Sequence, residues 1–324
     1  MTKWNPDLDR KIGRQLKLRD LHVLQAVNEL GSMAKAAAHL SVTQPAISQA
    51  IADLEAVVGV RLVDRGPRGV VPTIYGDALL RRGVEALDAL KQGMRDIEFL
   101  ANPGSGEVSV GADMSYIAGG FMSAIIDQMG KRHPRIAVHV VETTTIVGVP
   151  EYRELRERQV DVMLGRLSNP HLADDLTIEP LLDEAIVIVV SANSKWARQR
   201  NLMLRDLADE PWILAPGENI ARSLVEEAFR GAGIAPPRPR VTTFSMQLRM
   251  QLLATGRYIT VFTDTTLRYS AKRWGLKVLP FELPRRLPVV AVKLRHRSPT
   301  PAVEVFLDTA KAVTKSMRSI GLIT

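Results

Sequence analysis

Residues 32–68 read SMAKAAAHLSVTQPAISQAIADLEAVVGVRLVDRGPR, and this stretch decides the fold of the N-terminal part of the chain. Its centre, 43–58, predicts a helix that Thr43 caps and whose first turn holds Pro45, where a missing N–H costs nothing. Apolar residues recur there at intervals of three and four, on one helical face: Ile47, Ile51, Leu54 and Val58. That face belongs to a core, and Gly59 ends the helix.

The opposite face, near the start of this helix, carries Gln44, Ser48 and Gln49. Their uncharged polar groups can donate and accept hydrogen bonds, as the reading of base edges in a major groove requires. Carboxylates follow later in the helix, and DNA phosphates would repel them. The pattern therefore predicts that the first two turns, together with Thr43 and Pro45, contact DNA.

Two further helices precede this one. An alanine-rich helix, 33–40, starts after Ser32 and is separated from 43–58 by a short turn, which is the spacing of a helix-turn-helix. A supporting helix over 18–30 ends at Gly31, and the first sixteen residues are expected to form a loose arm. Residues 17–72 are thus expected to form one small domain.

A basic hairpin follows the helices. Two apolar segments, 61–63 and 70–71, flank Gly66-Pro67-Arg68-Gly69, which predicts a strand, a turn and a second strand. Arg65 and Arg68 lie near the tip, where their guanidinium groups would meet phosphate or the minor groove. The plain alternative is an ordinary charged hairpin. Its position directly after a recognition-type helix favours a winged helix-turn-helix.

Composition bounds the remaining possibilities. The 324 residues carry a formal net charge of +8, but residues 1–101 hold 14 Lys and Arg against 12 Asp and Glu, so bulk charge is weak evidence for DNA binding. The absence of cysteine excludes disulfides and thiolate metal sites. Without a signal-peptide pattern or an apolar run of about 20 residues, we expect a soluble cytoplasmic protein with no membrane partner.

A long helix is expected over 73–101. Its apolar residues recur at an average spacing near 3.4, which is close to a coiled-coil seam: Leu80, Val84, Leu87, Leu90, Met94 and Ile97. This pattern favours dimerisation, although a helix that packs on its own domain is the alternative. Pro103 and the glycines of 102–106 end the helix and form a hinge.

From residue 107 onward, strand-like and helix-like segments alternate. Strands are expected at 108–112, 137–141, 160–164, 186–190, 212–215, 241–244, 258–262 and 289–294, and helices include 115–131, 149–158 and 301–318. This order is typical of α/β lobes with a parallel sheet. We expect lobe I to comprise about 107–166 and 270–324, and lobe II about 167–269.

The chain resembles LysR-type transcriptional regulators along essentially its whole length. The resemblance rests on Leu21–Arg65, the helix that follows Thr73, Val160–Gly165, Ile178–Leu182 and Leu207–Pro211. It implies a winged helix, a dimerising linker helix and a two-lobed effector domain similar to periplasmic binding proteins, usually assembled as a tetramer. Family members read DNA with the positions that match Gln44, Pro45, Ser48 and Gln49, and many carry Arg or Lys at the last of them.

The resemblance also implies partners. It implies that a small metabolite in the cleft between the lobes changes contacts on double-stranded promoter DNA. The other implied partners are RNA polymerase and further copies of the chain, in a homodimer or homotetramer. In open α/β sheets, ligands gather beyond the carboxyl ends of strands. The expected effector residues at such positions are Asp113, Ser115, Thr144, Arg166, Phe244 and Ser245.

The chemistry of the effector stays open between two classes. Hydroxyl side chains at Ser115 and Thr144 match places that commonly touch the effector in the resembling family, although each could simply cap a helix. Asp113 suits a hydroxyl-rich ligand such as a sugar, whereas Arg166 could hold the carboxylate of a sugar acid or an aromatic or organic acid.

Other classes of protein have less support. Ser32-Met33-Ala34-Lys35 matches the Ser-x-x-Lys of penicillin-recognising enzymes, but the companion motifs are missing. The six histidines form no metal-ligand pattern, so we expect no enzyme activity, cofactor or metal. Two alternatives remain: a constitutive architectural DNA binder, and a solute-binding transport component, which the missing export signal disfavours.

Overall fold

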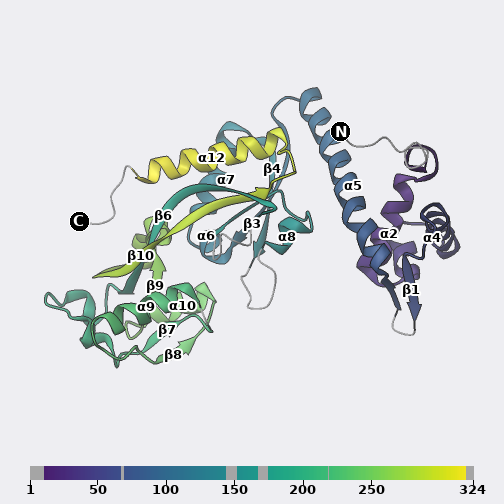
Figure 1. Cartoon of the computed structure of the whole chain (residues 1–324). Coiled ribbons are helices and arrows are strands. Elements are labelled where there is room, and N and C mark those ends of the chain that lie inside the picture. Colours follow the sequence, from purple (N-terminus) through teal and green to yellow (C-terminus); the bar gives the residue numbers. More distant parts are fainter. Residues whose placement is uncertain (1–10, 67–68, 144–151, 167–173, 218, 319–324) are drawn as a thin grey trace. The chain divides into compact units, whose positions relative to one another are not determined.

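The computed structural model describes residues 11–66, 69–143, 152–166, 174–217 and 219–318 (Figure 1). The chain divides into two compact units, Met1–Ile97 and Glu98–Thr324. Each unit buries its own hydrophobic core.

Within the described residues, the N-terminal unit is a helical bundle followed by a hairpin and a long helix. Its elements are the short π-helix η1 (Lys11–Gln15), α2 (Leu18–Leu30), α3 (Met33–His39), α4 (Gln44–Val58), β1 (Val63–Gly66), β2 (Gly69–Pro72) and α5 (Ile74–Ala101). The winged helix-turn-helix expected from residues 32–68 is confirmed. Of the arm expected at 1–16, residues 1–10 lie outside the described part, and the rest includes η1.

Helix caps fix these boundaries. The hydroxyl of Ser32 accepts the backbone N–H of Lys35, and that of Thr43 accepts the N–H of Ala46, both at 3.4 Å. Gly31 ends α2 in the left-handed region, which glycine adopts without strain. The bundle core contains, among others, Leu24, Val27, Ala36, Ile47, Ile51, Leu54 and Leu62.

Two glycines allow the hairpin to approach the helices closely. A Cβ at Gly69 would lie 2.5 Å from the carbonyl oxygen of Gly31, which accepts the N–H of Val70 at 2.9 Å. A Cβ at Gly76, in the first turn of α5, would lie 2.0 Å from the carbonyl oxygen of Leu62. A side chain at either position would therefore push the hairpin or α5 away from the bundle.

The C-terminal unit is an α/β structure. Its strands are β3 (Ser105–Asp113), β4 (Arg135–Thr143), β5 (Val162–Arg166), β6 (Leu176–Ser191), β7 (Trp212–Leu214), β8 (Pro239–Thr242), β9 (Ile259–Thr263) and β10 (Leu276–Leu294). Its helices are α6 (Met114–Ala118), α7 (Phe121–Arg132), α8 (Arg153–Arg156), α9 (Ile220–Gly231), α10 (Met246–Ala254), α11 (Asp264–Trp274) and α12 (Pro301–Arg318), with 3-10 turns η3 (Lys195–Arg198) and η4 (Leu204–Leu207). Across the described residues, one sheet runs in the order β4-β3-β5-β10-β6-β9-β7-β8.

The expectation of a parallel sheet is correct only in part. β3 runs parallel to β4 and β5, and β7 runs parallel to β8 and β9. β6 and β10 are antiparallel to each other, β10 is antiparallel to β5, and β6 is antiparallel to β9. The sheet is mixed because these two long strands cross from one lobe to the other and back.

The boundary between the lobes also differs from the expected one, because it falls within the two crossing strands. In β6, Leu182 belongs to the core of lobe I and Ile186 to that of lobe II, whereas in β10 the core of lobe II includes Leu287 and that of lobe I includes Val289. The core of lobe II therefore begins and ends later along the chain than the expected range 167–269.

Each lobe carries helices on both faces of its strands (Figure 1). In lobe I, α7 and α12 share one apolar cluster with β3 and β5, whereas α8 belongs to the cluster on Met163 and Val290. In lobe II, Ile186 and Ile188 point to the cluster of α9, and Val187 between them points to that of α10 and α11. This alternation is the two-residue period of a strand that is buried on both sides.

The single helix expected over 115–131 is two helices. Gly120 adopts a φ of 92°, and a Cβ at Gly119 would lie 2.5 Å from both the carbonyl oxygen of Ser115 and the hydroxyl of Thr266. The pair of glycines thus breaks the helix between α6 and α7. Of the helix expected at 149–158, residues 149–151 lie outside the described part, and α8 forms the remainder.

Candidate functional site

The first turn of α4 presents an exposed polar surface. Gln44 and Pro45 are exposed, and the capping residue Thr43 is exposed beside them. Ile47, one turn further along the helix, is fully buried in the bundle core. The burial of that apolar face leaves the amide of Gln44 directed to solvent at the start of the helix.

The next polar residues of α4 already have partners. The hydroxyl of Ser48 accepts a hydrogen bond from the guanidinium of Arg65 at 3.3 Å, and the amide of Gln49 donates to the carboxylate of Asp53 at 2.7 Å. The first bond joins the helix to the hairpin, and the second orients the Gln49 amide within the helix. Ser48 and Arg65, which the sequence suggested separately, therefore form one surface.

Two further hydrogen bonds connect the start of the hairpin to α4. The carboxylate of Glu55 accepts the backbone N–H groups of Leu62 and Val63, at 2.7 and 3.3 Å. Glu55 therefore holds the start of β1 against α4, a role that sequence reasoning missed. Arg68, expected at the tip of the hairpin, lies outside the described residues.

The long helix α5 exposes an apolar stripe. Leu80 is buried in the bundle core, and Leu87 packs against that core. Further along, Leu90, Met94 and Ile97 are exposed, with 67% of Met94 accessible. The apolar seam predicted for this helix thus leaves the bundle and continues as an uncovered face within the described residues.

The candidate effector residues of lobe I lie where β3 ends and α6 begins. One carboxylate oxygen of Asp113 accepts the backbone N–H of Ser115 at 2.9 Å and its hydroxyl at 2.6 Å. Asp113 therefore caps α6, and the hydroxyl of Ser115 has a partner. Thr144 lies outside the described residues, as does the side chain of Arg166, whose backbone ends β5.

The candidate residues of lobe II follow β8. The side chain of Phe244 is 44% exposed, and Ser245 caps α10 by accepting a backbone N–H of its first turn at 3.2 Å. Ala118 of α6 packs in the same apolar cluster as Met246 of α10. The helices that begin beside these candidates therefore meet where the lobes join.

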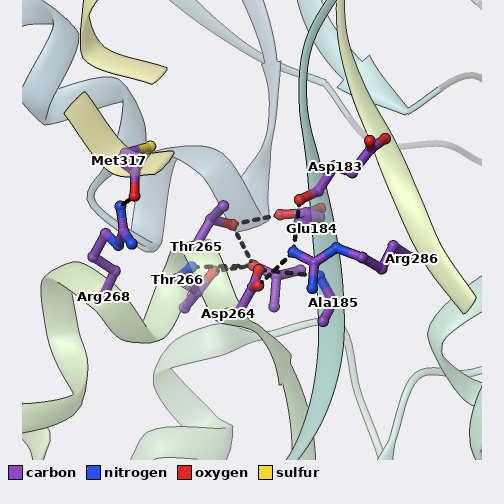
Figure 2. A network of polar contacts seen from close by, with 10 residues as sticks. Asp183, Glu184, Ala185, Asp264, Thr265, Thr266, Arg268, Arg286 and Met317 are labelled. Atoms are coloured by element: carbon purple, nitrogen blue, oxygen red, sulfur yellow. Dashed lines mark hydrogen bonds and ion pairs between the residues drawn. The ribbon is translucent and has the colours of Figure 1, made fainter. Parts of the chain in front are cut away.

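A buried carboxylate lies at this junction (Figure 2). Glu184, in β6, is fully buried, and its oxygens accept hydrogen bonds from the hydroxyl of Tyr116 in α6, at 3.1 Å, and from that of Thr265 in α11. The Thr265 hydroxyl also lies 2.8 Å from that of Thr263. One carboxylate thus joins a helix of lobe I, the crossing strand and the first turn of α11.

A second carboxylate lies beside it, as Figure 2 shows. Asp264 accepts the backbone N–H of Ala185 at 3.1 Å and the guanidinium of Arg286 at 2.9 Å. Arg286, in β10, also donates to the carbonyl oxygen of Asp183 at 2.8 Å. Together the two carboxylates bind both crossing strands to α11, which stabilises one placement of the lobes.

A half-buried arginine lies close to the same junction. Arg249, in α10, donates to the carbonyl oxygen of Val261 at 3.4 Å and stands 5.7 Å from the ring centre of Phe262. Its Nε is buried and has no hydrogen-bond partner in the part of the chain that the structure describes. Burial lowers the pKa of Arg249 to about 10.

Family models cover most of the chain. A model of the LysR substrate binding domain matches residues 101–315, and a model of the bacterial regulatory helix-turn-helix protein, lysR family, matches residues 18–77. The chain belongs to the LysR family of transcriptional regulators. The family expected from the sequence is confirmed, and the two matches coincide with the winged helix and the two-lobed α/β structure.

Relatives and solved structures agree with this assignment. The LysR regulator described here is 29% identical over 313 residues to the HTH-type transcriptional regulator GbpR of Azospirillum brasilense, across 95% of this chain and 90% of that one. Its fold is similar to ArgP from Mycobacterium tuberculosis, with a TM-score of 0.67, 23% identity and coverage of 93% and 98%. It is also similar to full-length CbnR complexed with its target DNA, with a TM-score of 0.52, 22% identity and coverage of 92% and 100%.

Sequence reasoning about this LysR regulator missed Glu184 and Arg249. Glu184 lies at the start of the apolar run 185–190 and Arg249 between two apolar residues, Leu248 and Met250, and a charged residue in such a place is the signal that could have marked them. Among the described residues, no group of three or more His, Cys, Asp or Glu could hold a metal ion. None of the described helices is long and apolar enough to cross a membrane.

Proposed function

We propose that this LysR regulator reads promoter DNA with the start of α4 and the adjacent hairpin, and that a small metabolite held between the two lobes changes its promoter contacts. The observation that carries the first part is the exposed surface of Gln44 and Pro45, continued by Ser48 and its partner Arg65.

The proposed surface makes two kinds of contact with DNA, one to base edges and one to the phosphate backbone. The amide of Gln44 can donate to and accept from one base edge, and an amide paired in this way with adenine is a common form of readout in the major groove. Arg65 is exposed on the hairpin, so its charge can neutralise a phosphate while the Ser48 hydroxyl lies beside it. Thr43 and Gln49 flank this surface, and Arg68, outside the described residues, is proposed as a further DNA contact.

The proposed effector site lies at the junction of the lobes. Asp113 ends β3 and Ser115 follows it, whereas Phe244 and Ser245 follow β8. The two strands lead into α6 and α10, and these helices pack together. Thr144 and Arg166 are proposed to complete the site. A sugar, a sugar acid, or an aromatic or organic acid has the size and polarity for such residues.

The assembly is proposed to be a homodimer or a homotetramer. The exposed apolar residues of α5, from Leu90 to Ile97, support pairing of this helix with a second copy. Two copies would present two α4 helices to a two-part site about one helical turn apart. RNA polymerase and the promoter in the cytoplasm are the remaining proposed partners.

Selection of sites from a random pool of duplexes tests the proposal. The full chain should enrich a partly palindromic sequence, and a metabolite should change the affinity for it or the length protected in footprinting. A chain that ignores duplex DNA in dilute buffer would refute DNA reading. A chain that binds DNA but responds to no metabolite would instead be an architectural DNA binder whose α/β unit serves oligomerisation.

A further inference from the structure

Arg249 lies on the buried side of α10. Met246, three residues before it, and Leu253, four residues after it, belong to the apolar cluster that also contains Phe262, and the adjacent Met250 packs against that cluster. A guanidinium on this side enters an apolar environment close to the end of β9. It is also near the place where Ala118 of α6 joins the cluster.

The charge of Arg249 is poorly compensated. Within the described residues, its guanidinium donates to a carbonyl oxygen over a long 3.4 Å and stands 5.7 Å from the ring centre of Phe262. Among the described residues, Nε has no hydrogen-bond partner and no carboxylate forms an ion pair with the guanidinium. Burial lowers the pKa, and no acid among the described residues opposes this effect.

Other enclosed arginines in the same unit are paired. Arg297 lies 2.9 Å from Asp161, with both side chains almost fully buried, and Arg222 lies 2.9 Å from Glu226. An enclosed cation without an anion is costly, and a methionine of similar length would fill the space without that cost. Structural needs therefore do not explain an arginine at 249.

We propose that Arg249 binds the carboxylate of the effector. The inference rests on the proposed function and narrows its ligand to a small organic or sugar acid. A guanidinium presents Nε and a terminal nitrogen along one edge, and this edge matches the two oxygens of a carboxylate.

The first test needs no ligand. Arg249→Met in the full chain should melt at the same temperature as the wild type or higher, because the substitution removes an uncompensated charge and keeps the packing. The matched control, Arg297→Met, should melt lower by more than about 6 °C, because it leaves Asp161 buried without its cation. An Arg249→Met variant that melts as low as the control, or does not fold, would overturn the inference.

The second test uses acids and their neutral counterparts as probes in thermal-shift and calorimetric titrations. The pairs are D-galacturonate with D-galactose, D-gluconate with sorbitol, and benzoate with benzyl alcohol. At least one acid should stabilise the wild type, its alcohol counterpart should not, and Arg249→Met should bind that acid at least about tenfold more weakly. Arg249→Lys, which keeps the charge but not the two-nitrogen edge, should recover only part of the affinity.

The outcomes separate this inference from the proposed function. If the alcohols stabilise wild type and Arg249→Met alike, the metabolite response stands and the carboxylate site is wrong. If an acid binds wild type and Arg249→Met equally, the assignment to Arg249 is wrong. If none of the acids stabilises the wild type, the carboxylate inference is contradicted, whereas the metabolite response is decided separately by the affinity and footprinting measurements on selected duplexes. Duplex DNA binding by Arg249→Met without probe should equal that of the wild type.

Discussion

Replacing Glu184 by alanine should loosen the junction between the two lobes. The substitution removes the acceptor of two hydroxyl groups, those of Tyr116 and Thr265, in a place that solvent does not reach. A buried donor left without an acceptor costs about 1–3 kcal/mol. Two such donors give a loss of about 3 kcal/mol or more in the free energy of unfolding of the C-terminal unit.

The expected change in melting temperature follows from the size of that unit. In a domain of 150–250 residues, about 1 kcal/mol corresponds to roughly 2–4 °C, so Glu184→Ala should lower the midpoint by about 6–12 °C. Scanning calorimetry of the full chain measures this midpoint. The neighbour Asp183 provides the control, because its side chain is exposed and only its backbone oxygen binds Arg286. Asp183→Ala should stay within about 0.5 kcal/mol of the wild type.

A double-mutant cycle identifies the cause. If the hydroxyl of Tyr116 is stabilised by Glu184, Tyr116→Phe should cost clearly less in the Glu184→Ala background than in the wild type, with a coupling of at least about 0.5 kcal/mol. Equal costs in both backgrounds, or a Glu184→Ala midpoint within about 1 °C of Asp183→Ala, would refute the assignment of this carboxylate to the junction.

Three further predictions concern other parts of the chain. Arg65→Ala should weaken binding to specific and random duplexes alike and reduce the slope of log affinity against log salt concentration by about one. Fluorescence anisotropy over a series of salt concentrations measures this slope. An unchanged slope would exclude a phosphate contact by Arg65. In urea denaturation, Gly76→Ala should lower the free energy of unfolding of the N-terminal unit by about 1–3 kcal/mol, because the added Cβ meets a backbone oxygen. The control Gly93→Ala, whose Cβ enters open space, should instead stabilise α5 by about 0.5–1 kcal/mol. Equal effects of the two substitutions would contradict the close approach at Gly76. The Arg156 guanidinium holds the pKa of the Asp175 carboxyl below its usual range, so the pair stabilises the fold at pH values above that range and loses this effect as the pH falls through the lowered pKa. Arg156→Met should therefore lower the melting temperature slightly at about pH 7 and leave it unchanged at about pH 2. An equal loss at both pH values would contradict this role of the pair.

The sequence predicted the features that local chemistry determines. The spacing of Ile47, Ile51 and Leu54 defined the buried face of α4, and Thr43 and Gly59 marked its ends. Each of these signals is contained within one helix, so neighbouring residues suffice to predict it.

Features that depend on distant parts of the chain were not predictable in this way. The antiparallel course of β6 and β10 depends on which strands pair, and alternation within a strand does not encode its partner. The junction brings Tyr116 and Thr265 to Glu184 from segments 68 and 81 residues away. Glu55 was interpreted as a carboxylate that phosphates repel, whereas its bonds to the backbone of β1 became evident only when the hairpin was in place.

The most direct measurement compares wild type and Gln44→Ala on one selected duplex and on every single-base variant of it. If the start of α4 enters the major groove, the wild type should lose about 1–3 kcal/mol for a change at a contacted base pair, and Gln44→Ala should lose that preference at one position in each half-site while binding random duplex as before. A Gln44→Ala protein that keeps every base preference of the wild type would contradict a DNA-reading role for this surface.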